Sequence, residues 1–176
     1  GDHRDLHLSL RRQRQMCIRD SKSTYQTEDF TCYPKAVYLF RHAEKQIIKG
    51  EDNPELTRAG FSRSNALAKA MADITPGLIY SSEYTRTQQT VAPLAKQWGS
   101  DIIIQTAKDP EAQVEAALSN CNKHVIIAGH SNTIPNLISL FGVMDEIAIE
   151  DNQYGDLFII EWENAKPKLR VEQVGE

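Results

Sequence analysis

This chain has few cysteines and a small net charge: 176 residues include three cysteines, and the net charge is −4. No cluster of Cys, Asp or Glu has a spacing suited to a metal, so we expect no metal and no cofactor. The small negative charge argues against a general nucleic-acid binder. No apolar run predicts a membrane span, and there is no internal repeat or low-complexity tract. The length suits one globular domain with a substantial core.

The N-terminal segment, residues 1–30, is polar, contains several arginines, and has no apolar run long enough for a signal peptide. We expect it to be disordered, with the folded domain at residues 31–176. Residues 16–21, Met-Cys-Ile-Arg-Asp-Ser, resemble the in-frame translation of a transposon end used in sequencing libraries. We therefore interpret residues 1–21 as non-native and expect a native leader to be missing. A basic arm that binds nucleic acid is the alternative.

Two apolar runs lead into histidines. Residues 36–40, Ala-Val-Tyr-Leu-Phe, precede Arg41 and His42, and residues 124–128, His-Val-Ile-Ile-Ala, lead through a glycine into His130. Each run predicts a buried strand followed by a helix start. Ligands bind at the carboxyl ends of strands in α/β sheets, so both histidines are candidate site residues. Taken alone, His130 would be a capping histidine or one at the edge of the core.

An arginine follows a third predicted strand. Residues 78–80 are apolar, and Arg86 lies at the start of the next helix. Alone, Arg86 could be a solvent-exposed cation. In a parallel sheet, however, such junctions lie on one edge, so Arg86 can converge with Arg41, His42 and His130. Arginine binds phosphate oxygens bidentately, and histidine can attack or carry a proton near neutral pH. The combination therefore indicates a phosphate site.

Strands and helices alternate along the chain. Strands are predicted at residues 36–40, 78–81, 101–106, 124–128 and 156–162, with an antiparallel partner at 169–174, and helices at 57–72, 85–98, 110–119 and 133–141. Pro93 should kink or break the second helix. This order predicts a three-layer α/β/α sandwich whose mostly parallel sheet has a C-terminal antiparallel edge strand. We expect the polar loops 46–55 and 143–156 to determine specificity.

These segments resemble, in order, the motifs of the histidine phosphatase superfamily, also called the phosphoglycerate mutase-like family. Arg41 and His42 match its Arg-His-Gly signature, with Ala43 in place of glycine. Residues 56–60, Leu-Thr-Arg-Ala-Gly, look like its Leu-Thr-x-x-Gly helix start, and residues 81–90 are similar to its Ser-x-x-x-Arg-x-x-x-Thr segment. Gly129-His130 resembles its second catalytic histidine. The resemblance covers roughly residues 35–162 and implies a small, single-domain bacterial member.

The resemblance implies a metal-independent phosphatase, a phosphoric monoester hydrolase of the histidine acid phosphatase type. His42 would attack phosphorus to give a phosphohistidine, and His130 would donate to a phosphoryl oxygen. The residues implied in substrate binding are Arg41, Arg86, Ser131 and Asn132. The expected partner is a small phosphate ester or a phosphohistidine. Two alternatives remain: a non-catalytic phosphate- or phosphohistidine-binding module, and a phosphomutase, which would need a site closed to water.

The general acid is not evident. One branch of the family has Asp after the second histidine, where this chain has Ser131, so that branch is excluded. Another branch has Glu after the third strand, where Asp109 and Glu111 are candidates, although Asp109 could simply cap the next helix. Glu44 is a third candidate, although it could pair with Lys45. Small bacterial phosphohistidine phosphatases of the family also lack an obvious acid, which favours activated substrates such as phosphoramidates.

Cys32 and Cys121 precede the strands that lead to the two histidines. The family fold implies that these strands are parallel neighbours, about 4.8 Å apart. A Cys32–Cys121 disulfide is therefore expected, with two free thiols as the alternative. A disulfide would imply an oxidising compartment, so we expect the bacterial periplasm or secretion, with the cytoplasm as the alternative.

Overall fold

The structure is a computed structural model that describes residues 32–175. The expectations for residues 1–30, including the non-native origin of residues 1–21, lie outside the described residues. The elements are β1 (Ala36–Arg41), α1 (Arg58–Ala70), β2 (Leu78–Ser82), α2 (Thr85–Trp98), β3 (Ile102–Gln105), α3 (Pro110–Leu118), β4 (His124–Gly129), α4 (Thr133–Leu140), β5 (Asp156–Glu163) and β6 (Lys166–Gln173). The predicted alternation of strands and helices is confirmed, with ends that differ by at most three residues.

The six strands form one sheet in the order β3-β2-β4-β1-β5-β6. The first four of these are mutually parallel, whereas β5 runs antiparallel to β1 and forms a hairpin with β6. This confirms the mostly parallel sheet with an antiparallel C-terminal edge. The carboxyl ends of β1, β2, β3 and β4 consequently lie along one edge of the sheet, where the predicted site residues were expected to meet.

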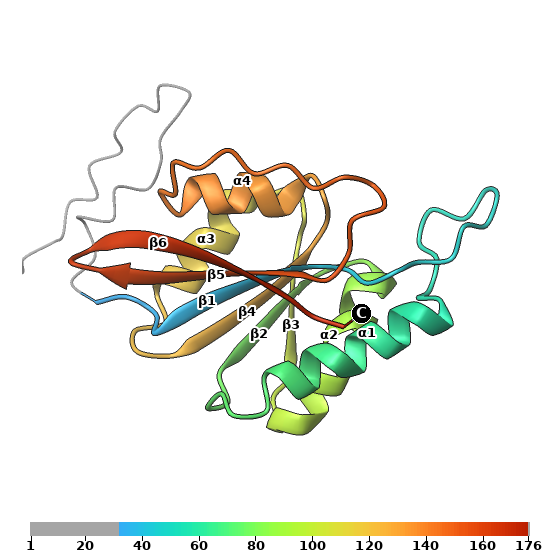
Figure 1. The fold of residues 1–176 in the computed structure, drawn as a ribbon, viewed down its shortest axis with the longest axis horizontal. Helices are drawn as coiled ribbons and strands as arrows, with labels where there is room; N and C mark the ends of the chain where they lie inside the picture. Colours follow the sequence, from blue (N-terminus) through green and yellow to red (C-terminus); the bar gives the residue numbers. More distant parts are fainter. Residues whose placement is uncertain (1–31, 176) are drawn as a thin grey trace, which may run out of the picture.

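Helices cover both faces of the sheet, α1 and α2 on one side and α3 and α4 on the other (Figure 1). Alternate residues of β1 supply the two cores: Tyr38 and Phe40 pack toward α1 and α2, and Val37 and Leu39 pack toward α3 and α4. A strand buried on both faces has a continuous apolar sequence, which explains the run at residues 36–40. The predicted three-layer sandwich is confirmed.

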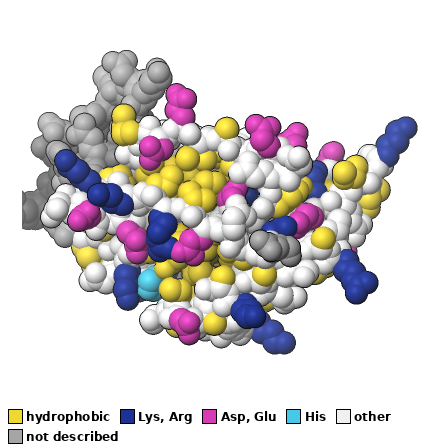
Figure 2. Space-filling model, in the orientation of Figure 1, with side chains coloured by type: hydrophobic (Ala, Val, Ile, Leu, Met, Phe, Trp, Pro, Cys, Tyr) yellow, Lys and Arg dark blue, Asp and Glu magenta, His cyan; other side chains and the backbone are white. Residues whose placement is uncertain are grey.

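Charges of both signs are interspersed on the face shown in Figure 2. Among the described residues, no helix is both long and apolar enough to cross a bilayer. The chain as a whole carries a net charge of −4, so a site rich in positive charge can only be a local feature of its surface.

Pro93 was expected to kink or break the second helix, and no break occurs there, because α2 runs without interruption from Thr85 to Trp98. Proline lacks an N–H and leaves the carbonyl four residues earlier, that of Gln89, without its helical donor. The buried Ser64 hydroxyl of α1 lies 2.9 Å from this carbonyl and 2.7 Å from that of Thr90, so its single proton is shared between the two. The neighbouring helix thus compensates for the proline, which a reading of α2 alone could not show.

Cys32 and Cys121 form a disulfide with a Cα–Cα distance of 5.4 Å. Backbone hydrogen bonds continue the β1–β4 pairing toward it, with Lys35 donating to Lys123 over 2.9 Å. The expected disulfide is therefore present. It lies at the amino ends of β1 and β4, a strand length of about 20 Å from the histidines.

Candidate active site

The register of β1 and β4 brings the two histidines together. Arg41 is paired with Gly129, and the His42 N–H donates to the Gly129 carbonyl over 2.9 Å. His130, the residue directly after β4, thereby lies beside His42, with ring centroids 5.4 Å apart and ring planes inclined at 62°. Both side chains are buried, with exposures of 4% and 7%. Two apolar strands in register are sufficient to build this pair.

The His42 ring has a defined tautomer. Its Nδ1 lies 2.8 Å from the Ala43 carbonyl, which can only accept, so Nδ1 carries the proton. Burial lowers the pKa of His42 to about 3; the bond to Ala43 opposes this shift, and the nearby His130, Arg86 and Arg41 add to it. The ring is therefore neutral at pH 7. Its Nε2 retains a free lone pair, as a nucleophile requires.

His130 lies at the end of a chain of hydroxyl groups. Its Nε2 is 2.9 Å from Ser82 Oγ, which is 2.7 Å from Thr87 Oγ1, and Thr87 Oγ1 donates to the Tyr84 carbonyl over 2.7 Å. With the Thr87 proton committed to a carbonyl, the Ser82 hydroxyl donates to Thr87 and accepts from His130 Nε2–H. Burial, followed by the charge of Arg86, lowers the pKa of His130 to about 4. This tautomer leaves Nδ1 as the acceptor.

Arg41 is held by the loop that follows α4. Its Nη1 donates to the carbonyls of Glu150 and Gln153, each at 2.7 Å, and its Nη2 donates to that of Asp151 at 3.1 Å. The guanidinium also lies 4.4 Å from the ring centroid of Tyr154. Its Nε is buried and has no hydrogen-bond partner among residues 32–175. The Nε–H group of Arg41 therefore remains as a donor for an anion.

Arg86 is arranged in a similar way on the other side of the histidine pair. Its Nη2 lies 3.5 Å from His130 Nδ1, its Nη1 reaches the Asp52 carbonyl at 3.4 Å, and its guanidinium lies 4.4 Å from the ring centroid of Tyr84. Its Nε is also buried without a partner within the described part of the chain. Two buried, unpartnered guanidinium N–H groups in one site call for an oxygen-rich anion, because an unpaired buried donor is costly.

The histidines and arginines line an open cavity of about 430 Å³. Its lining consists of Arg41, His42, Lys45, Tyr84, Arg86, Ala107, Lys108, His130, Ser131, Asn132, Thr133 and Asp151. All four residues predicted as catalytic are brought together here, along with the predicted binding residues Ser131 and Asn132. In the described part of the chain, no group of three or more His, Cys, Asp or Glu side chains is arranged to hold a metal ion.

A family model described as histidine phosphatase superfamily (branch 1) matches residues 37–109. This span includes the Arg41–His42 pair and Arg86, which the structure places together with His130 in the cavity. The match bears out the resemblance of residues 37–109 to the histidine phosphatase superfamily. No curated protein sequence matches it.

Solved structures of several phosphatases share the fold. A phosphoserine phosphatase from Entamoeba histolytica is similar with a TM-score of 0.61 and 14% identity, over 80% of this chain and 97% of that one. A mycobacterial glucosyl-3-phosphoglycerate phosphatase gives 0.58 and 14%, over 78% and 95%. A putative phosphohistidine phosphatase SixA from Agrobacterium tumefaciens gives 0.57 and 21%, over 81% and 98%. The folded region therefore spans nearly the whole of each of these chains.

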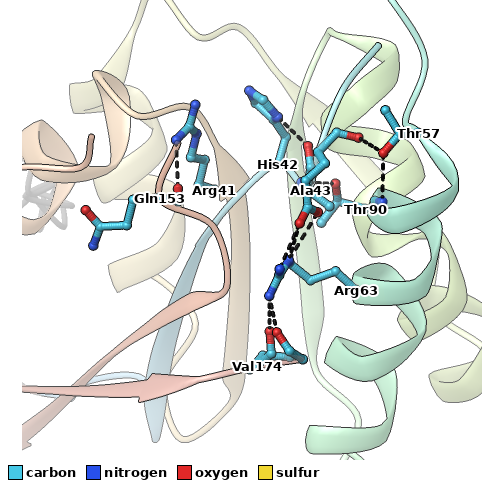
Figure 3. Close-up of polar contacts among 11 residues, drawn as sticks. Arg41, His42, Ala43, Thr57, Arg63, Thr90, Gln153 and Val174 are labelled. Carbon is cyan, nitrogen blue, oxygen red and sulfur yellow. Dashed lines mark hydrogen bonds and ion pairs between the residues drawn. The ribbon is translucent and has the colours of Figure 1, made fainter. Parts of the chain in front are cut away.

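Three of the four matched segments meet around His42, and Figure 3 shows Ala43, Thr57 and Thr90 from them. Thr90, at the end of the Ser-x-x-x-Arg-x-x-x-Thr segment, accepts from the Ala43 N–H over 2.9 Å and donates to the Arg86 carbonyl over 2.7 Å. Thr57 caps α1 and its N–H donates to the Glu44 carbonyl over 2.8 Å. A Cβ on Gly60 would lie 2.3 Å from that carbonyl oxygen, so only glycine fits. These contacts fix the backbone on which His42 sits.

Glu44 is not placed to act as the general acid. Its carboxylate forms a salt bridge of 2.7 Å with Arg63 of α1, rather than pairing with Lys45, and in Figure 3 Arg63 lies on the side away from the His42 ring. Burial works to raise the pKa of Glu44, but the hydrogen bonds from Arg63 and the backbone outweigh it and leave the pKa lowered. Arg63 also donates to the carbonyls of Val174 and Gly175, so Glu44 anchors the site loop to the C-terminus.

The other candidate acids also lie outside the cavity lining. Asp109 caps α3, its carboxylate accepting from the Ala112 N–H over 3.0 Å, and Glu111 lies in the first turn of that helix. The capping alternative for Asp109 is therefore confirmed. Asp151 is the one carboxylate that lines the cavity within residues 32–175, and it is exposed.

Several lining residues were missed from the sequence. Lys45 and Lys108 each follow a predicted strand within a few residues, and this position was a usable signal. Tyr84 precedes α2 and forms an edge contact with His130 at 5.0 Å between ring centroids. Asp151 lines the cavity and Tyr154 packs on Arg41; both belong to the loop 143–156 that was expected at the site, but the loop has no motif that singles out these two residues.

Proposed function

We propose that this protein is a metal-independent phosphatase, a phosphoric monoester hydrolase of the histidine acid phosphatase type that works through a phosphohistidine on His42. The observation that carries the proposal is the state of His42: a neutral ring whose Nδ1–H is fixed on the Ala43 carbonyl and whose Nε2 lone pair is free. This nucleophile lies in a cavity with two arginines that each keep a buried, unpartnered Nε.

In the first step, the phosphoryl dianion binds to the free N–H groups of Arg41 and Arg86, with Ser131 and Asn132 nearby at the start of α4. His42 Nε2 attacks phosphorus in line, and the bond to the leaving-group oxygen breaks. The bound dianion favours the protonated form of His130, which then donates from Nε2 to Ser82 and from Nδ1 to a phosphoryl oxygen. Water then attacks the phosphohistidine and releases phosphate.

Hydrolysis is favoured over transfer to a second substrate hydroxyl because the cavity is open to water. Lys108 and Asp151 on its lining are exposed, and Lys45 is only half-buried. A mutase would need to exclude water from the phosphohistidine, and these exposed residues indicate that water has access.

The test is turnover of p-nitrophenyl phosphate in EDTA by the wild type and by His42→Ala. Wild-type turnover with an acid-labile phosphoryl group trapped on the protein, both lost in the variant, is the expected result. Arg58→Ala is the matched control, since Arg58 is exposed on α1 and does not line the cavity. Full activity in His42→Ala would overturn the mechanism. Vanadate binding without any turnover would identify the chain as a phosphate-binding module, the alternative favoured by the lack of a carboxylic acid beside His42.

We further propose that the protein works in an oxidising compartment, such as the bacterial periplasm or the extracellular space. The Cys32–Cys121 disulfide supports this, because such bonds are rare where thiols are kept reduced. Thiol-blocking of the protein in freshly lysed native cells tests it. Blocking of both cysteines before any reductant is added would contradict the proposal.

A further inference from the structure

We propose that the substrate is a phosphoanhydride, a linear diphosphate or longer phosphate chain whose terminal phosphoryl group is transferred to His42 while Lys108 holds the departing phosphate. This inference rests on the phosphohistidine mechanism of the proposed function and extends it from phosphoric monoesters to phosphoanhydrides. It follows from the direction in which the leaving group must depart and from the residues found there.

The leaving group departs on the side of phosphorus opposite His42, because displacement at phosphorus is in line. His42 follows β1, and along the edge of the sheet come β4 with His130, then β2 with Arg86, and finally β3 with Lys108. Three strand spacings separate β1 from β3, or about 14 Å. A phosphoryl group held between the histidines and Arg86 thus has Lys108 beyond it, on the leaving side.

No protonated carboxyl group is available on that side among the described residues. Asp109 is committed to capping α3. Glu83 accepts from the Ala107 N–H over 2.9 Å, and although burial works to raise its pKa, the backbone hydrogen bonds and the charges of His130 and Lys108 leave that pKa lowered. An alkyl phosphate needs an acid to protonate its strongly basic leaving oxygen, and no carboxyl group of the described residues lines the cavity on that side, since Asp151 belongs to the loop that holds Arg41.

A phosphate leaving group avoids this need. It departs as a stable anion that requires no proton, and an ammonium group is suited to receive it, because opposite charges attract and Lys keeps its charge at neutral pH. Lys108 forms no salt bridge with another described residue, so its charge remains available to a ligand, apart from the exposed Glu83 nearby. Lys45 adds a second cation on the β1 side of the cavity.

The step balances without a co-reactant other than water. The His42 Nε2 lone pair forms the N–P bond, and the bond between the terminal phosphorus and the bridging oxygen breaks, with its electron pair staying on the departing phosphate. Nδ1–H remains bonded to the Ala43 carbonyl. Water then attacks phosphorus and the N–P bond breaks, so that inorganic phosphate is released, one proton passes to solvent and His42 is again neutral.

The test compares three substrates in EDTA: inorganic diphosphate, p-nitrophenyl phosphate and glycerol phosphate. The first has a second phosphate and a weakly basic leaving group, the second has only the weakly basic leaving group, and the third has neither. We expect kcat/KM for diphosphate to exceed that for glycerol phosphate at least tenfold (on the order of the contribution of general acid catalysis). A preference for glycerol phosphate over diphosphate would overturn the inference.

Charge reversal at Lys108 tests the subsite itself. We expect Lys108→Glu to lower kcat/KM for diphosphate roughly tenfold more than for p-nitrophenyl phosphate, and Lys108→Arg to restore most of the loss. Lys96→Met, which removes a charge at the exposed far end of α2, should leave the ratio of the two substrates unchanged. Equal losses on both substrates in Lys108→Glu would overturn the subsite. If His42-dependent turnover of p-nitrophenyl phosphate is also absent, the proposed function fails as well, which separates the two outcomes.

Discussion

Ser82 Oγ lies 2.9 Å from Nε2 of His130, and this contact decides which nitrogen of the His130 ring carries the proton. With Nε2–H bonded to serine, Nδ1 is the atom beside Arg86. Ser82 is the first residue of the Ser-x-x-x-Arg-x-x-x-Thr segment when that motif is read as Ser82, Arg86 and Thr90. One motif therefore orients His130, supplies an arginine of the cavity lining and fixes the His42 backbone.

Ser82→Ala should lower kcat about 10- to 100-fold with little change in KM, because it removes a hydrogen bond to a ring that becomes charged when phosphate binds. Ser82→Thr, which keeps the hydroxyl, should recover most of the activity. The readout that isolates positioning is the ¹⁵N spectrum of His130, which should show mixed tautomers in the alanine variant. A pure Nε2–H tautomer in Ser82→Ala would remove the physical basis of the prediction.

Acid should destabilise the free protein through its two site histidines. Their pKa values fall from 6.5 in the unfolded chain to about 3 for His42 and about 4 for His130 in the fold. Below pH 6.5 the unfolded state therefore binds more protons, and stability falls as the pH falls toward these folded values. The expected loss between pH 7 and pH 5 is about 2 kcal/mol for each histidine.

Urea denaturation at the two pH values measures this loss. His42→Asn should reduce it by about 2 kcal/mol relative to the wild type, since one buried neutral imidazole has been removed. An identical loss in both proteins would show that His42 titrates normally in the fold. Phosphate, which favours protonated His130, should protect the wild type more strongly at pH 5 than at pH 7.

Replacing Arg86 and replacing Arg58 should have very different effects on turnover. Arg86→Ala should reduce turnover of p-nitrophenyl phosphate roughly 100-fold or more, because it removes a cation from the charge that develops in the transition state. Arg58→Ala should have little effect, because Arg58 is exposed outside the cavity. Steady-state kinetics of both variants provide the comparison, and equal losses would count against the cavity as the site of reaction.

How much of this site the sequence predicts depends on whether a residue lies on a strand end or on a loop. His42, His130 and Arg86 follow apolar runs, and parallel strands align their carboxyl ends whatever the intervening chain does. The ties between Arg41 and the carbonyls of residues 150–153 could not be predicted, because backbone groups have no sequence signature. The same applies to Pro93, whose missing donor is replaced by a side chain from another helix.

Glu44 is the residue whose assignment changed most, from candidate acid to anchor. Glu44→Gln should keep most of the activity, because an amide still accepts hydrogen bonds from Arg63, whereas a general acid replaced by an amide would lose its proton. Arg63→Ala should lower the free energy of unfolding by about 1–3 kcal/mol, since it leaves the partly buried Glu44 carboxylate without its partner. Loss of activity in Glu44→Gln, with stability unchanged, would return Glu44 to the list of acids.

Reduction of the Cys32–Cys121 bond should affect stability more than chemistry. The bond joins residues 89 positions apart, and in the chain-entropy model such a loop contributes up to about 4.5 kcal/mol. A double Cys→Ser variant at these positions should unfold at a lower urea concentration yet retain kcat, because the bond lies at the amino ends of β1 and β4. Mass spectrometry after thiol blocking is the control: one group, on Cys17, is expected without reductant and three after reduction. A loss of kcat with stability unchanged would mean that the disulfide acts on the site rather than on the fold.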